Sequence, residues 1–277
     1  MSKTYLITGV SSGFGYEMTK QLLAKGETVV GTVRNDKKVQ SLIEEYPNTF
    51  FRRFLDVTDT KAINELVADI YQHVDKVDVL INNAGYGLFG AAEELSAEEV
   101  NHIIATNLTG SIEMIRSILP HMRKQGGGRI IQMSSYGGQV AFAGNSMYHA
   151  TKWGIEGFIE AVAQEVVPFN IGMTIVEPGG ARTEFRYGSA QVAQLMPEYN
   201  KNPAHEFLTM LDQKNGLAPG DPEKMAAKII ESVAIEPAPL RMVLGSIALK
   251  STIDTLEKRL ENFKSQTKLA ASTDFIE

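Results

Sequence analysis

The sequence predicts an α/β protein in which helices cover both faces of a parallel β-sheet. Short runs rich in β-branched residues alternate with amphipathic segments of helical length. The run Tyr5-Leu6-Ile7 is continuously apolar, as expected for a strand buried on both faces. Because strand–helix alternation gives parallel strands joined by right-handed crossovers, we expect a single, doubly wound Rossmann-type domain with a sheet of about seven strands.

The individual elements follow from these runs and from their turn residues. The expected strands are Thr4–Thr8, Thr28–Val33, Phe50–Leu55, Val77–Ile81, Arg129–Met133, Gly172–Val176 and Leu240–Leu244. The expected helices lie near 14–25, 37–45, 60–75, 96–124, 148–168 and 221–234. Residues 1–249 would form the domain, and 250–277 a helical tail, because Leu256, Leu260 and Phe263 recur at helical spacing. This tail could cap the core or contact a partner chain.

The regular alternation of predicted strands and helices is interrupted between residues 184 and 220. This segment contains Pro197, Pro203 and Pro219 among scattered apolar residues. An insertion before the last strand lies near the carboxyl edge of the sheet, where a substrate lid would sit. A plain connection that includes a helix is the alternative.

Composition excludes several classes of protein. Hydrophobic content of 43% and charged content of 22% are ordinary for a soluble protein, and a net charge of −6 argues against general nucleic-acid binding. No apolar run approaches the roughly 20 residues that span a bilayer, and MSKTYLITG leads directly into a strand without a signal peptide. There is no Cys, and the five His residues form no metal-binding pattern, so no metal site is expected. These features suit a cytoplasmic enzyme without requiring one.

A glycine-rich loop connects the first expected strand to the first helix. Its sequence is Thr8-Gly9-Val10-Ser11-Ser12-Gly13-Phe14-Gly15. Glycines permit a tight turn and close approach of a ligand, and the following helix N-terminus offers free N–H groups to a pyrophosphate. The spacing is G-x-x-x-G-x-G, but its strand–helix context favours a dinucleotide site over a structural turn. The cofactor contacts expected here are Gly9, Ser11, Ser12, Gly13, Phe14 and Gly15.

The residue after the second expected strand bears on which dinucleotide binds. NAD sites usually place an acidic residue there, whereas Val33 is followed by Arg34, whose planar guanidinium suits a 2′-phosphate. A solvated surface arginine is the alternative. Asp36 lies close by, and Ser12 adds no second basic contact. On balance the pattern favours NADP over NAD.

The segment from Gly126 to Lys152 carries residues suited to proton transfer. Its apolar run is followed by Ser135 and a loop of small residues, and Tyr148 lies four positions before Lys152, on the same helix face. A neighbouring ammonium favours phenolate, so we expect the pKa of Tyr148 to fall from about 10 toward neutrality. Tyr148 could then exchange a proton with an alcohol or carbonyl oxygen that Ser135 holds.

The Tyr-x-x-x-Lys spacing is weak evidence by itself, since Tyr16 and Lys20 share it without a preceding strand–loop–Ser element. Taken in order, however, the motifs resemble those of the short-chain dehydrogenase/reductase superfamily, in its compact single-domain branch. The resemblance covers residues 3–185 by motif and the whole chain by size. The matching residues are the glycine loop, Arg34, Asp56-Val57, Asn82-Asn83-Ala84-Gly85, Asn107, Ser135, Tyr148, Lys152, Pro178-Gly179 and Thr183.

The resemblance implies a role for each of these positions. The adenine ring would contact Asp56 and Val57, the cofactor would lie beside Asn83, Ala84 and Gly85, and the nicotinamide end would rest on Pro178, Gly179 and Thr183. It further implies that Asn107 holds a water of the proton relay and that Lys152 grips the nicotinamide ribose. Family members assemble as homodimers or homotetramers, here through the helices near 96–124 and 148–168.

The expected function is NADP-dependent interconversion of a carbonyl compound and a secondary alcohol, with Tyr148 as general acid/base. An apolar small-molecule substrate is expected, because the candidate pocket walls are Phe89, Val140, Phe142, Met147, Phe185 and Tyr187. Two alternatives are a dinucleotide sensor without turnover and a sugar-nucleotide epimerase or dehydratase. The glycine spacing and the chain length argue against the epimerase. The substrate itself and the direction of the reaction stay open.

Overall fold

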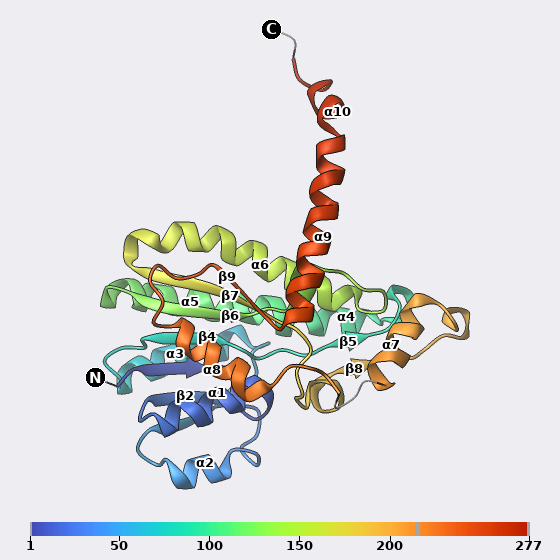
Figure 1. The fold of residues 1–277 in the computed structure, drawn as a ribbon. Coiled ribbons are helices and arrows are strands. Elements are labelled where there is room, and N and C mark those ends of the chain that lie inside the picture. Colours follow the sequence, from blue (N-terminus) through green and yellow to red (C-terminus); the bar gives the residue numbers. More distant parts are fainter. Residues whose placement is uncertain (1, 214–216, 276–277) are drawn as a thin grey trace.

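The computed structural model, which describes residues 2–213 and 217–275, confirms the predicted sheet (Figure 1). Seven parallel strands lie in the order β3-β2-β1-β4-β6-β7-β9. Their bounds are β1 Thr4–Ile7, β2 Thr28–Val33, β3 Phe50–Phe54, β4 Val79–Asn82, β6 Gly128–Met133, β7 Ile171–Pro178 and β9 Arg241–Leu244. The order reverses direction beside β1, so a crevice opens at the carboxyl ends of β1 and β4.

Helices cover both faces of this sheet, as expected. Helices α1 (Gly13–Ala24), α2 (Gln40–Glu45) and α8 (Pro222–Ser232) pack on one face. Helices α3 (Thr60–His73), α5 (Gly110–Gln125) and α6 (Ser146–Val166) pack on the other. The result is a three-layer sandwich with two apolar cores, one on each side of the sheet (Figure 1).

Strand β1 shows how the sequence specifies these layers. Its side chains alternate between the faces, so that Leu6 joins one core while Tyr5 and Ile7 join the other. Leu6 and Ile7 are both fully buried, and each such side chain stabilises the fold by about 1.5–3 kcal/mol. A strand buried on both sides therefore needs the continuous apolar run seen in the sequence.

The helix expected over 96–124 is three segments in succession. Helix α4 (Ala97–Ile104) passes into a π-helical turn over Ala105–Thr109, which continues as α5. A π-turn widens the helix by one residue and re-aims the side chains within it. Here the turn contains Asn107, which is 1% exposed.

The insertion over 184–220 folds against the carboxyl end of the sheet. It contains a π-helical turn over Phe185–Ser189, strand β8 (Gln191–Val192) and helix α7 (Pro203–Gln213). Strand β8 pairs in parallel with β5 (Leu88–Phe89), and a bridge between Ala181 and Gly220 closes the base of the insertion. The insertion is thus tied at its root and through β5, on the side where a lid was predicted (Figure 1).

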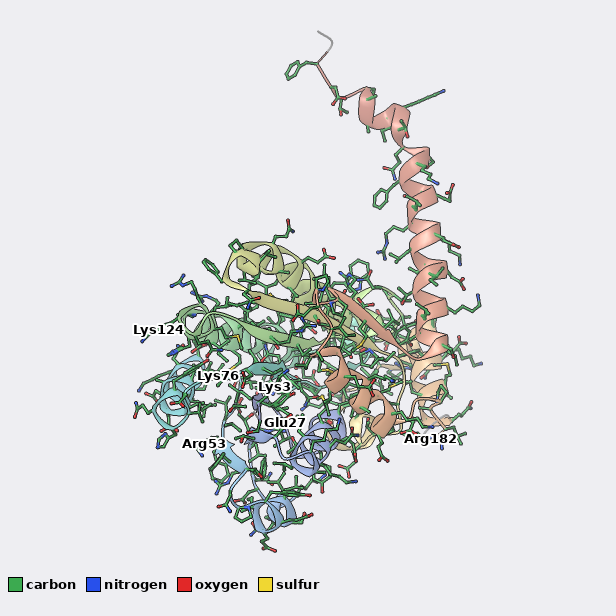
Figure 2. The ribbon with its side chains drawn as sticks, turned by 60° about the vertical axis from the view of Figure 1, so that its left-hand side comes forward. Lys3, Glu27, Arg53, Lys76, Lys124 and Arg182 are labelled. Atoms are coloured by element: carbon green, nitrogen blue, oxygen red, sulfur yellow. The ribbon has the colours of Figure 1, made fainter. Side chains whose placement is uncertain are left out.

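Helix α9 (Ser246–Ser265) begins before residue 250, where the predicted tail starts, and is followed by α10 (Thr267–Ala271). Ala248 and Thr252 are buried against the body, and Arg259 still contacts it, whereas the C-terminal part of the helix projects away, with side chains on several sides (Figure 2). Within the described residues, none of the helices combines the length and the apolar character needed to cross a membrane.

Candidate active site

One cavity of about 840 Å³ lies at the carboxyl ends of the central strands. Every catalytic or cofactor-binding residue predicted from the sequence lines it, except Gly15 and Asn107. The predicted residues that line it are Gly9, Ser11, Ser12, Gly13, Phe14, Arg34, Asp56, Val57, Asn83, Ala84, Gly85, Ser135, Tyr148, Lys152, Pro178, Gly179 and Thr183. Residues scattered over most of the chain therefore meet in a single space of the size that ligand sites occupy.

The glycine loop adopts a conformation that side chains would oppose. Gly9 and Gly13 have φ angles of 73° and 56°, in the left-handed region. At Gly15 a Cβ would lie 2.3 Å from Gly9 O, so this glycine lets the helix approach the loop rather than touching the cavity. Ser12, the N-cap of α1, makes no side-chain capping bond within the described chain, which leaves backbone N–H groups for an anion.

The segment after β4 fixes the glycine loop in place. The Asn83 Nδ2 group donates to Thr8 O and to Gly9 O, each at 3.0 Å. In return Thr8 Oγ1 accepts hydrogen bonds from the backbone N–H groups of Asn83 and Ala84, also at 3.0 Å. These four bonds join the ends of β1 and β4, so the loop is rigid before any ligand binds.

Asn107 lies behind the cavity wall rather than in it. Its Oδ1 accepts from Tyr86 N at 3.0 Å, and its Nδ2 donates to Tyr86 O at 2.8 Å. A Cβ on Gly85 would come within 3.2 Å of Asn107 Oδ1 and 3.9 Å of Lys152 Nζ. Asn107 and Lys152 therefore both border Gly85, a position that the amphipathic pattern of 96–124 does not reveal for Asn107.

Helix α6 brings Tyr148 and Lys152 against the end of β6. Lys152 Nζ donates to Met133 O at 2.9 Å and lies 5.6 Å from the centre of the Tyr148 ring. The Ser135 side chain lies near enough to Tyr148 to lower the pKa of its phenol. Ser135 Oγ also accepts from Gly137 N at 3.0 Å, so that backbone bond orients the serine toward the tyrosine. The two hydroxyls and the ammonium form one cluster at the cavity wall.

The pKa values in this cluster follow from burial. Burial raises the pKa of Tyr148 to about 12, although the nearby Ser135 side chain acts in the opposite direction. Burial also lowers the pKa of Lys152 to about 8, with the nearby Glu156 carboxylate opposing the change. The expectation that Lys152 lowers the Tyr148 pKa is therefore wrong for the chain alone, because the enclosed site penalises phenolate and ammonium alike.

Arg34 lies exposed at the rim of the cavity, directly after β2. The neighbouring Asp36 is paired with Arg52 at 3.5 Å. Asp56, across the rim, accepts from Thr58 N at 2.9 Å; that bond and the charge of Arg34 contribute to the lowered pKa of its carboxyl group. The rim thus combines one exposed guanidinium with carboxylates that have other partners.

The deeper part of the cavity is aromatic and apolar. Phe89, Phe142 and Phe185 line it as predicted, whereas Val140 and Met147 do not, because they pack in the protein interior. The side chain of Tyr187 falls outside the described residues. Sequence reasoning missed two contributions to the wall: Phe207, Met210 and Leu211 of α7, and Gly245–Ala248 at the start of α9.

Rings from distant segments meet in this wall. The rings of Phe142 and Phe207 are stacked at 5.5 Å with an interplanar angle of 7°, and Phe185 meets Tyr148 edge-on at 6.1 Å. An apolar surface therefore extends from the Tyr148 ring into the inserted segment. The i, i+3, i+4 spacing of Phe207, Met210 and Leu211 was a signal in the sequence for this helical face.

A buried carboxylate fastens the inserted segment to the body. Glu94, whose side chain is fully buried, accepts from Ala91 N at 2.6 Å, from Met196 N at 2.7 Å and from His205 Nε2 at 2.7 Å. Two of these donors belong to the insertion and one to the body. The apolar wall is therefore held over the cavity by an ionisable group that sequence reasoning did not identify.

The fold and the cavity are those of a Rossmann-type protein with one large ligand site, and comparison with known proteins identifies the class. The family model described as short chain dehydrogenase matches residues 3–192. The chain is 32% identical to "Oxidoreductase BOA17" of Botryotinia fuckeliana, over 90% of this chain and 91% of that protein. It is 36% identical to 3-ketodihydrosphingosine reductase of Bacteroides thetaiotaomicron, over 87% of each. The chain therefore belongs to the short-chain dehydrogenase/reductase superfamily.

Solved structures agree with this assignment. A short-chain dehydrogenase from Streptomyces avermitilis is 36% identical and superposes with a TM-score of 0.93, covering 99% of this chain and all of that one. The closed form of serine dehydrogenase complexed with NADP⁺ is 26% identical, with a TM-score of 0.74 over 87% of this chain and 93% of that one. The family is one of oxidoreductases that bind nicotinamide dinucleotides and act on small molecules.

Proposed function

We propose that this chain is an NADP-dependent oxidoreductase that interconverts an apolar carbonyl compound and a secondary alcohol, with Tyr148 as general acid/base. The observation that carries the proposal is the cluster of Ser135, Tyr148 and Lys152 where the cavity's polar half meets its aromatic wall. A substrate oxygen placed between the two hydroxyls would have its apolar groups against that wall. The homo-oligomer and the cytoplasmic location expected from the sequence stay predictions.

The residues present fit a nicotinamide dinucleotide. The left-handed glycines and the open N-terminus of α1 suit a pyrophosphate, and Asp56 and Val57 border the space beside Arg34. When bound, this cofactor supplies or accepts the hydride. The protein's own residues then have to orient the substrate and move one proton.

Ser135 is suited to orient the substrate oxygen. Because its Oγ already accepts from Gly137 N, its own proton is available to a carbonyl oxygen, on which negative charge develops during reduction. Tyr148 donates its proton to that oxygen in reduction and removes one in oxidation. Its raised pKa keeps the phenol protonated near pH 7, which favours the donating role.

Lys152 is suited to return the proton that Tyr148 gives up. A pKa of about 8 lets its amine gain and lose a proton close to neutral pH. Asn107 and Lys152 both border Gly85, and by family resemblance Asn107 would hold a water of a relay between Lys152 and solvent. In this proposal the lysine acts mainly as a proton donor to the phenol.

Two observations support the finer parts of the proposal. The exposed Arg34 at the rim supports NADP, as do neighbouring structures described as NADP complexes, such as "ElxO with NADP Bound" at 26% identity. The aromatic wall supports an apolar substrate, and one relative is named for reduction of 3-ketodihydrosphingosine, a long-chain ketone.

The test is a steady-state assay of the purified chain with NADPH and with NADH against ketones of increasing chain length, and with NADP⁺ against the matching alcohols. We expect NADPH oxidation whose kcat/KM rises with apolar chain length. Tight NADPH binding without turnover in either direction would instead indicate a sensor, and selectivity for small charged ketones would contradict the substrate class.

A further inference from the structure

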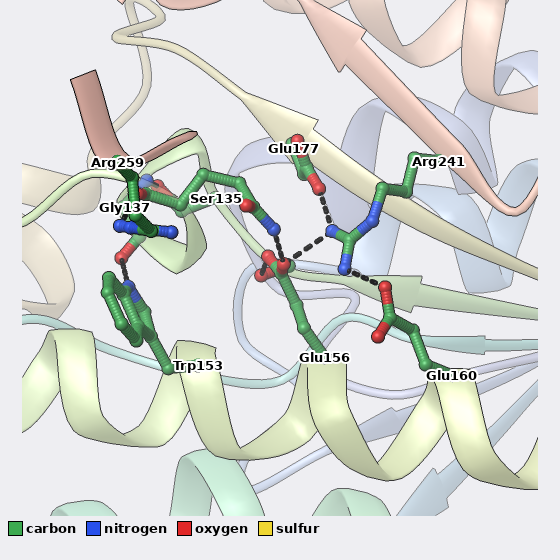
Figure 3. A network of polar contacts seen from close by, with 10 residues as sticks. Ser135, Gly137, Trp153, Glu156, Glu160, Glu177, Arg241 and Arg259 are labelled. Carbon is green, nitrogen blue, oxygen red and sulfur yellow. Dashed lines mark hydrogen bonds and ion pairs between the residues drawn. The ribbon is translucent and has the colours of Figure 1, made fainter. Parts of the chain in front are cut away.

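We propose that Arg259, on the projecting helix α9, is a positioning residue that holds the loop carrying Ser135 in its reactive geometry. The inference rests on the proposed function for its kinetic readout. Its structural basis is a chain of contacts that runs from α9 to the Ser135 hydroxyl (Figure 3).

The first link joins α9 to the loop and to α6. Arg259 Nη2 donates to Gln139 O at 3.0 Å, and its guanidinium carbon lies 4.8 Å from the centre of the Trp153 ring. Figure 3 shows Arg259 reaching down toward Gly137 and Trp153. One side chain from the far end of the sequence therefore contacts the loop after β6 and the residue next to Lys152.

The second link runs from Trp153 to the serine. Trp153 Nε1 donates to Gly137 O at 3.1 Å, and His149 Nδ1 contacts the same oxygen at 2.7 Å. The Gly137 peptide in turn donates its N–H to Ser135 Oγ at 3.0 Å. Gly137 thus links Trp153, through its carbonyl oxygen, to Ser135 Oγ, through its N–H group, and so helps to hold the serine oxygen in place.

The inner side of the same loop is held by a separate and buried network. Glu156, which is 2% exposed, accepts from Ser134 Oγ at 2.5 Å and from Arg241 Nη1 at 2.5 Å. It also bonds to Gln139 Nε2 (Figure 3). A Cβ at Gly138 would overlap Glu156 Oε1, so the loop is packed tightly on this side.

Arg259 and Glu156 therefore hold opposite sides of one loop, but they differ in burial. Breaking the Glu156 network leaves a charge in the core and endangers folding. Arg259 lies at the edge, beside a Trp153 ring that is 43% exposed, so its loss loosens the loop without opening the core. A substitution at Arg259 is therefore expected to displace the serine without unfolding the protein.

The test compares Arg259→Gln with the matched control Lys258→Gln on the exposed face of the same helix. Trp153 is the only tryptophan of the chain, so its fluorescence reports the Arg259 contact directly. We expect Arg259→Gln to shift Trp153 emission, to speed hydrogen exchange in residues 134–140 and to lower kcat roughly 10- to 100-fold, the scale of a displaced catalytic group. NADPH affinity should stay unchanged, and Lys258→Gln should match wild type throughout.

A double-mutant cycle with Ser135→Ala decides whether Arg259 acts through the serine. If it does, Arg259→Gln causes little further loss of kcat in the Ser135→Ala background, and Arg259→Lys recovers part of the rate. A full, multiplicative loss in that background, or wild-type kcat in Arg259→Gln, would overturn the proposal. If the wild-type chain showed no turnover, the proposed function would fail separately, and unaltered exchange of residues 134–140 in Arg259→Gln would then overturn this one.

Discussion

Lys152 Nζ lies 5.6 Å from the centre of the Tyr148 ring, while its hydrogen bond goes to Met133 O at 2.9 Å. Lys152 is 6% exposed, and burial lowers the pKa of its ammonium group to about 8, from an ordinary 10.5. A cation kept in such a place destabilises the folded chain. Under the proposed function, the lysine is therefore kept next to Tyr148 for proton transfer although it lowers the stability of the fold.

Replacing Lys152 by Met should stabilise the protein. Below pH 8 the lysine is protonated in both the folded and the unfolded chain, so the folded state carries the full cost of the buried charge. That cost is at most about 3 kcal/mol, and losing the bond to Met133 O offsets about 1 kcal/mol. We expect the free energy of unfolding in urea at pH 7 to rise by about 2 kcal/mol, together with loss of turnover.

The stability that the protein gains from Lys152→Met should also decrease as the pH rises. Between pH 8 and 10.5 the folded wild-type chain releases the Lys152 proton and escapes the penalty, so wild type and variant should converge near pH 10.5. The exposed Lys258→Met is the control and should show no such trend. A Lys152→Met variant less stable than wild type at pH 7 would show that the ammonium has stabilising partners.

Arg34→Ala should weaken NADPH binding far more than NADH binding. A guanidinium that contacts a phosphate contributes about 1.5–3 kcal/mol, which corresponds to a roughly 10- to 100-fold rise in the Kd for NADPH. Calorimetric titration with NADPH and with NADH measures the two Kd values. Lys37→Ala, at an exposed position near Arg34, is the control. Equal losses for NADPH and NADH would mean that Arg34 does not recognise the 2′-phosphate.

Glu94→Gln should loosen the inserted segment 184–220, the predicted lid, while leaving the glycine-loop end of the cavity unaffected. The carboxylate accepts three hydrogen bonds, whereas a glutamine would present an N–H group to at least one of those donors. We expect faster hydrogen exchange over residues 190–213 and a roughly 10-fold rise in substrate KM, with NADPH affinity unchanged. Glu93→Gln, which alters only the exposed contact from Tyr199, is the control. Unchanged exchange would show that the other contacts of the inserted segment, such as the β5–β8 pairing, hold it without Glu94.

The same carboxylate sets a lower pH limit for attachment of the inserted segment to the body. Burial by itself raises the pKa of Glu94, but hydrogen bonds from Met196, Ala91 and His205 outweigh it and lower the pKa below its usual 4.5. The attachment is therefore fully present above pH 4.5 and is lost as pH falls through that lowered value. Protection of residues 190–213, corrected for intrinsic exchange, should persist at pH 5 and fall only in stronger acid.

The sheet could be predicted from the sequence because strands that are buried on both faces need continuous apolar runs, as in β1 and β2. The sequence was also sufficient for most of the site because the motif residues follow directly after those strands. It did not reveal β5 and β8, since two-residue strands leave no periodic pattern. It also missed the π-turn at Asn107, where the apolar pattern of a continuous helix persists across the insertion of one residue.

The other features that the sequence did not predict depend on tertiary contacts. Whether Val140 or Phe142 enters the cavity depends on loop geometry after β6, and both are apolar. Whether the pKa of Tyr148 is raised or lowered depends on how completely the site is enclosed. The spacing of residues along a helix does not reveal this. The roles of Glu94 and Arg259 arise from contacts with residues about 100 positions or more away, and neither lies in a recognisable motif.

The most direct test of the central claim is the turnover of Tyr148→Phe with NADPH and the best ketone found for the wild-type chain. The substitution removes only the phenol oxygen, so NADPH affinity should be retained while kcat falls by roughly 100-fold or more, as for loss of a general acid. A Tyr148→Phe variant that binds NADPH and reduces the ketone at the wild-type rate would contradict the account.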